Sequence, residues 1–82
     1  MIFIDNILDL ERDIQSYKDM FPETYRNYDF IKNVAERHYN DPVGIVFGVE
    51  VSSEWQDKCY GFEVEKVTPE HTYIRYIGVW KC

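Results

Sequence analysis

The chain has 82 residues, of which 45% are hydrophobic and 17% aromatic, a composition typical of a folded globule and not of a disordered chain. Its formal net charge is −6, and the acidic residues are spread along the chain instead of forming a tail. This balance argues against direct nucleic-acid binding, since a phosphate backbone needs a basic partner. It is compatible with a protein partner whose surface is basic.

We expect a single domain over residues 1–82, because a chain of this length supports one small hydrophobic core. The N-terminus lacks the basic region of a secretory signal, and no apolar run approaches the ~20 residues of a membrane span. These observations predict a cytoplasmic protein without membrane contact. The two cysteines, Cys59 and Cys82, are expected to stay reduced in that compartment.

The first half of the chain has the periodicity of helices. Apolar residues recur at alternating four- and three-residue steps over residues 3–21, which places them on one helical stripe. Asp5 is the expected N-cap of this helix, and Pro22 ends it or begins the next one. The first element of the chain is therefore expected to be a helix that includes Phe3.

A second helix is expected from about Thr24 or Asn27 to Tyr39. Pro42 stops it, because proline cannot continue a helix and restricts the residue before it. Together the two helices are expected to form an αα-hairpin.

From residue 43 the hydrophobic period changes from 3.6 to 2, the period of β-strands. Strands are expected over residues 44–51, 58–67 and 72–82. The predicted fold class is α+β, with two N-terminal helices packed on one face of a three-stranded antiparallel sheet in the order ααβββ. An alternative adds a short N-terminal strand, residues 1–4, beside the last strand.

The last strand is apolar on both faces. One face carries Tyr73, Ile77 and Val79, and the other carries Ile74, Tyr76 and Trp80. The register that matches apolar side chains pairs Phe62 with Tyr76, but it needs a three-residue loop around Pro69. Proline suits a two- or four-residue loop, which shifts the pairing by one and turns Ile74, Tyr76 and Trp80 outward. Both registers leave one apolar row away from the helices.

No catalytic, cofactor or metal site is expected, and the protein is not expected to be an enzyme. Cys59 with His38 or His71 would be a nucleophile and base, but no local signature surrounds the cysteine. Neither histidine has further ligands at a recurrent metal-binding spacing, and no glycine-rich phosphate motif occurs.

Aromatic and acidic residues are the remaining functional signal. Seven tyrosines and two tryptophans suit an interaction surface, because their side chains combine a large area with a polar tip. Filling a small core is the alternative use of the same residues. The residues expected to contact a partner are Glu50, Trp55, Glu63, Glu65, Ile74, Tyr76 and Trp80.

The first functional hypothesis is a small acidic protein-binding module that inhibits or antagonises a basic, nucleic-acid-handling protein. It would be an immunity-type or virus-encoded antagonist from a bacterium or a virus, with carboxylates standing where phosphates normally sit. The second is a structural or assembly protein that homodimerises, or docks on a larger assembly, through the aromatic face of its last strand. The third is a small enzyme that uses Cys59 and a histidine.

Overall fold

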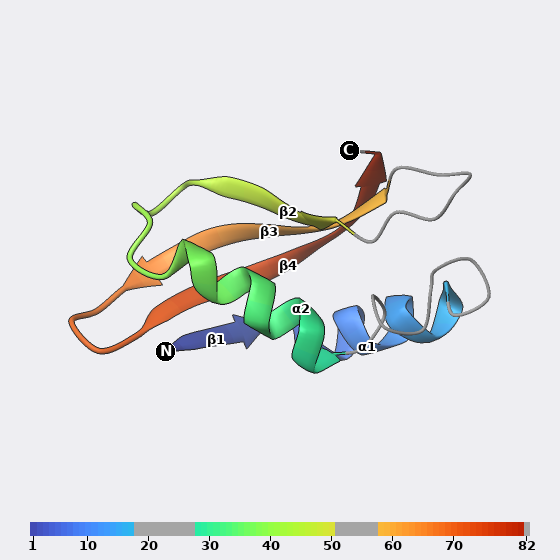
Figure 1. The fold of residues 1–82 in the computed structure, drawn as a ribbon, viewed down its shortest axis with the longest axis horizontal. Coiled ribbons are helices and arrows are strands. Elements are labelled where there is room, and N and C mark those ends of the chain that lie inside the picture. Colours follow the sequence, from blue (N-terminus) through green and yellow to red (C-terminus); the bar gives the residue numbers. More distant parts are fainter. Residues whose placement is uncertain (18–27, 51–57, 82) are drawn as a thin grey trace.

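The computed structural model describes residues 1–17, 28–50 and 58–81. The predicted α+β class is confirmed (Figure 1). In chain order the elements are β1 (Ile2–Asp5), α1 (Ile7–Ser16), α2 (Tyr28–Ala35), the short 3-10 helix η2 (Glu36–His38), β2 (Val46–Glu50), β3 (Lys58–Val67) and β4 (Thr72–Lys81).

The sheet has four strands in the order β1-β4-β3-β2, which corrects the predicted three-stranded sheet. The strands β2, β3 and β4 pair antiparallel, as expected, whereas β1 pairs parallel to β4. In that pair Ile2 lies opposite Thr72, and Asp5 lies opposite Arg75. The alternative with an extra strand at the N-terminus is therefore the one observed, and the sheet is mixed.

The turn from β1 into α1 explains why the first helix begins later than expected. Asn6 has a left-handed backbone conformation, with φ 68° and ψ 30°, which carries the chain out of the strand. Its side-chain Nδ2 donates to the carbonyl oxygen of Tyr76 at 3.2 Å and ties the turn to β4. Phe3 and Asp5 belong to the sheet, so their assignment to the helix, with Asp5 as N-cap, is wrong.

The helices otherwise follow their apolar stripes. In α1, Leu10 is fully buried, and Ile14 packs against the core beside it. In α2, Ile31 and Ala35 are buried. The α-helical part of this second helix ends at Ala35, and η2 continues it to one residue before the predicted end. The predicted end of the first helix and start of the second lie outside the described residues.

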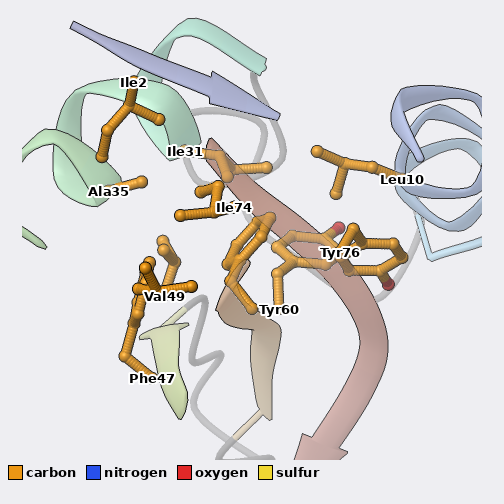
Figure 2. Packing of buried hydrophobic residues seen from close by; sticks show 11 residues of the cluster. Ile2, Leu10, Ile31, Ala35, Phe47, Val49, Tyr60, Ile74 and Tyr76 are labelled. Carbon is orange, nitrogen blue, oxygen red and sulfur yellow. The ribbon is translucent and has the colours of Figure 1, made fainter. Parts of the chain in front are cut away.

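Both helices bury their apolar stripes against the same face of the sheet. Figure 2 shows Leu10 of α1 and Ile31 of α2 directed towards Ile74 and Tyr76 of β4. The buried cluster consists of Ile2, Leu10, Ile31, Ala35, Phe47, Val49, Tyr60, Phe62, Val64, Ile74 and Tyr76. The inward rows follow the alternation of each strand, with Phe47 and Val49 buried in β2 and Tyr60, Phe62 and Val64 buried in β3, and the bounds of β3 are those predicted. β2 is shorter than predicted: Ile45 precedes it and is exposed.

In the last hairpin a β-bulge reconciles the register that matches apolar side chains with the loop length that suits proline. Four residues separate Val67 from its partner Thr72, which is a loop length that suits Pro69. Glu65 has no partner in β4, because Val64 pairs with Ile74 and Lys66 pairs with Tyr73. The extra residue cancels the shift that the four-residue loop would otherwise impose. The apolar-matching register is therefore observed together with the longer loop.

A second bulge divides the last strand into two parts with opposite alternation. Phe62 pairs with Tyr76, but the next pair is Gly61 with Gly78, so Ile77 is the extra residue. Gly78 has φ 115°, a conformation that favours glycine. Beyond this point Val79 packs on the core. Each of the two predicted rows of the last strand is thus split between the two faces of the sheet.

Candidate protein-binding surface

The face of the sheet opposite the helices, called the outer face below, carries no helix in the described part of the chain. Its residues follow from alternation with the buried row and from the strand register. They are Phe3 and Asp5 in β1, Tyr73, Arg75 and Trp80 in β4, Cys59, Gly61, Glu63, Glu65 and Lys66 in β3, and Val46, Gly48 and Glu50 in β2.

The centre of the outer face is a carboxylate cluster, formed by Asp5, Glu63 and Glu65 around Arg75. The guanidinium of Arg75 lies 3.3 Å from Glu63 through Nη2 and 3.5 Å from Glu65 through Nε. A side-chain hydrogen bond with Asp5 raises the pKa of Glu65 above its ordinary value, and desolvation and the Asp5 charge act in the same direction. The cluster therefore holds more negative charge than its single arginine compensates.

An aromatic patch adjoins this cluster at the end of the sheet nearest the β3–β4 loop. The ring of Phe3 stacks on Tyr73 with centroids 5.4 Å apart, and His71 meets Phe3 edge-on at 4.8 Å. The ammonium of Lys66 lies 5.6 Å from the centroid of Tyr73, within the range of a cation–π contact. Phe3 is 39% exposed, so this patch offers apolar area to solvent.

Trp80 forms the opposite end of the outer face. A Cβ atom added at Gly61 would overlap its six-membered ring, and one at Gly48 would lie 3.4 Å from its Nε1. The indole of Trp80 thus reaches from β4 across β3 towards β2, over the two glycines. A close approach of this kind is a common reason for a glycine inside a strand.

Four of the seven residues predicted to contact a partner lie on the outer face: Glu50, Glu63, Glu65 and Trp80. Ile74 and Tyr76 do not, and their assignment to a contact surface is wrong. They are 0% and 2% exposed, because the bulge at Glu65 keeps them opposite Val64 and Phe62 in the core. Trp55 lies outside the described residues.

The contact prediction also omitted residues that the fold brings to the outer face. The helical prediction for Phe3 and Asp5 separates them from the sheet, whereas in the structure they lie beside Tyr73 and Arg75 of β4. The alternation of residues 2 to 5 carries a strand signal, with Ile2 buried and Phe3 exposed, but four residues are too few to outweigh the helical pattern that follows.

A pocket of about 330 Å³ opens beside the outer face, between α1 and β4. Asp9, Arg12 and Asp13 line it from the helix, and Ile77 and Gly78 line it from the strand. Arg12 lies 3.1 Å from Asp9 and 3.8 Å from Asp13.

The hydroxyl of Tyr76 donates to Asp13 at 2.5 Å, and both residues line this pocket. Burial and the hydrogen bond to Asp13 raise the pKa of Tyr76 well above its ordinary value near 10. This hydrogen bond joins the helical wall of the pocket to the strand wall.

The residues considered for catalysis do not form a nucleophile and base. Cys59 is disulfide-bonded, which corrects the expectation of a reduced thiol and removes the thiolate that nucleophilic attack needs. Cys82 lies outside the described residues. His38 Nδ1 lies 2.8 Å from Asp41, and its ring stacks on Phe47 with centroids 3.7 Å apart.

The described part of the chain holds neither a metal-binding cluster nor a membrane-spanning helix. Residues 1–17, 28–50 and 58–81 contain no group of three or more His, Cys, Asp or Glu side chains that could hold a metal ion. Within those ranges no helix is long and apolar enough to cross a membrane. In comparisons with known proteins, the chain matches no family model, no curated protein and no solved structure.

Proposed function

We propose that this chain is a small, non-enzymatic protein-binding module that covers a basic surface of a partner protein with the outer face of its sheet. The observation that carries the proposal is the carboxylate cluster, which lies on a sheet face that no described helix covers. The partner is defined by its chemistry: exposed arginine or lysine side chains beside apolar area.

Charge supports a basic partner. On the outer face the carboxylates of Asp5, Glu50, Glu63 and Glu65 outnumber the cations of Arg75 and Lys66. The pKa of Glu65 is raised first by its side-chain hydrogen bond with Asp5 and by desolvation, and the charges of Asp5 and Glu63 act in the same direction. A guanidinium or ammonium group from a partner would relieve the repulsion between the carboxylates, and the attraction would be strongest at low salt.

Aromatic area supports a contact between proteins. Phe3 and Tyr73 on one side of the cluster and Trp80 on the other are side chains that anchor protein interfaces. The exposed fraction of Val46 is 52%, which extends the apolar area onto β2. An acidic centre with apolar flanks matches a basic protein surface better than it matches a small ligand.

The finer proposal is an antagonist of a nucleic-acid-handling protein, of immunity type or encoded by a virus. The carboxylate cluster would then stand where phosphates bind. A cytoplasmic location stays a prediction, and the disulfide at Cys59 weighs against it because disulfides persist mainly in oxidising compartments.

The test is capture of a basic partner from the native host extract by the immobilised protein, followed by affinity measurement with the purified partner. The Glu63→Lys/Glu65→Lys variant is expected to lose most of its affinity at low salt. The control is Glu11→Lys/Glu70→Lys, which makes the same charge change at exposed positions outside the outer face. Full affinity of the outer-face variant at low salt would refute the proposal.

The assembly alternative, docking through the aromatic face of the last strand, now depends on Tyr73 and Trp80, the aromatic side chains that β4 places on the outer face. Ile74 and Tyr76 are buried in the core and are not available to a second copy. Light scattering at high protein concentration tests what remains, because a monomer would leave a heterologous partner as the occupant of the outer face.

A further inference from the structure

The strand β4 has an edge that its neighbour β1 covers only in part. The register with β1 runs from Thr72 to Arg75 and stops there, whereas β4 continues to Lys81. At Asn6 the chain turns away from β4, and the side-chain Nδ2 of Asn6 donates a hydrogen bond to the carbonyl oxygen of Tyr76. Among the described residues no strand pairs with the stretch from Ile77 to Lys81 on this side.

A groove lies along the beginning of this uncovered edge. The pocket of about 330 Å³ has Ile77 and Gly78 on its strand side and Asp9, Arg12 and Asp13 on its helix side. An exposed strand edge beside a helix is a common arrangement for binding an extended peptide, because the edge supplies backbone hydrogen-bonding groups and the helix supplies side-chain contacts.

The charges around the groove select the kind of peptide. Asp9 and Asp13 outnumber Arg12 on the helix side. Arg75, the other arginine of the pocket, is already held by Glu63 and Glu65 on the outer face. The surroundings are therefore net negative, which favours a segment with lysine or arginine side chains.

We propose that the groove between α1 and the uncovered edge of β4 binds an extended, basic segment of a partner protein, which adds to the sheet as a further strand in line with β1. The proposal deepens the proposed function, in that the bound strand belongs to the same partner. The groove and the outer face share Arg75, so one partner can contact both.

The probe is a short synthetic peptide of alternating lysine and valine, with its glutamate–valine counterpart as the charge control. In a titration followed by amide NMR, the lysine–valine peptide is expected to shift the resonances of Asp9 and of Ile77 to Lys81. It is also expected to slow the exchange of edge amides in β4, as strand addition requires. The glutamate–valine peptide is expected to do neither.

Two variants with matched controls test the site. Ile77→Lys places a charge on the edge and is expected to weaken binding of the lysine–valine peptide at least about tenfold. Ile45→Lys is its control, because the two isoleucines have nearly equal exposed fractions, 40% and 41%, and Ile45 lies next to β2. If Ile77→Lys does not fold, Asp9→Lys replaces it, with Glu11→Lys on the same helix as the control.

Three outcomes would overturn the proposal. One is the absence of shifts along β4 at millimolar peptide, and another is equal binding of the two peptides. The third is a dimer in solution that Ile77→Lys converts to a monomer, which would assign the edge to a second copy of this chain. Binding of the lysine–valine peptide to Glu50→Lys, an outer-face variant that leaves Arg75 and its two carboxylate partners in place, at near wild-type strength separates the groove from the outer face, so either proposal can fail alone.

Discussion

The ring of Trp80 in β4 occupies the space that a side chain at Gly61 in β3 would need. Gly48 in β2 is similarly confined, since a Cβ atom there would lie 2.8 Å from Cβ of Cys59. The two glycines therefore form a floor beneath the indole. Trp80 is held on the outer face by this floor, although no described helix covers it.

Gly61→Ala is expected to lower the free energy of unfolding by about 1–3 kcal/mol, because the new methyl group overlaps the indole and forces it to move. Adding Trp80→Ala should remove most of that penalty, so the double-mutant cycle in urea should show strong coupling. Gly44→Ala is the control: its cost comes from φ 95° in open space, and Trp80→Ala should not rescue it. Additive effects of Gly61→Ala and Trp80→Ala would contradict the packing of the indole on Gly61.

Tyr76→Phe is expected to destabilise the protein at neutral pH by about 1.5–3 kcal/mol, the range for a hydrogen bond to a charged group such as Asp13. The raised pKa of Tyr76 also gives the wild type an alkaline transition. The contribution of the Tyr76 hydroxyl to the free energy of unfolding is complete below the pKa of this tyrosine in the unfolded chain, near 10. That contribution is lost as pH rises beyond this value. Urea unfolding between pH 7 and 11 should show this loss in the wild type and a smaller one in Tyr76→Phe. Equal pH dependence in the two proteins would contradict the role of Tyr76.

Asp5→Asn is expected to lower the pKa of Glu65 towards its ordinary value, because Asp5 is the largest cause of its elevation. A raised folded-state pKa means that folding favours the protonated carboxyl of Glu65. The protonated carboxyl therefore adds to the free energy of unfolding at low pH, and this addition is lost as pH rises through the raised pKa. The carboxyl resonance of Glu65 in an NMR pH titration measures the change. Glu11→Gln removes a carboxylate elsewhere and should leave that titration unaltered.

Because the chain has two cysteines and Cys59 is disulfide-bonded, at most one titratable thiol is expected in the unfolded, unreduced protein. A reductant should lower the free energy of unfolding by about 2–4 kcal/mol if the bond closes a loop within one chain. Cys59→Ala should be insensitive to the same reductant. Two reactive thiols before reduction would contradict the disulfide, and a bond between chains would appear as a dimer in non-reducing electrophoresis.

The sequence by itself determined the elements whose hydrophobic period extends over many residues. The bounds of β3 and the inward rows of β2 and β3 follow from alternation, because a strand has the same period wherever it packs. The burial of Leu10 and Ile31 follows from helical spacing in the same way. The acidic character of the surface, with Glu63 and Glu65 facing away from the helices, was also available from the residues alone.

Only the tertiary structure decided which residues share the outer face. The segment Ile2–Asp5 becomes a strand because β4 offers it an edge, a contact between residues about 70 positions apart that no local pattern records. The bulge at Glu65 lets the four-residue loop around Pro69 coexist with the buried apolar pairs of β3 and β4. The bulge at Ile77 brings Gly78 opposite Gly61. Asp5, Glu63 and Arg75 come from three strands, and their meeting depends on a register that bulges adjust by single residues.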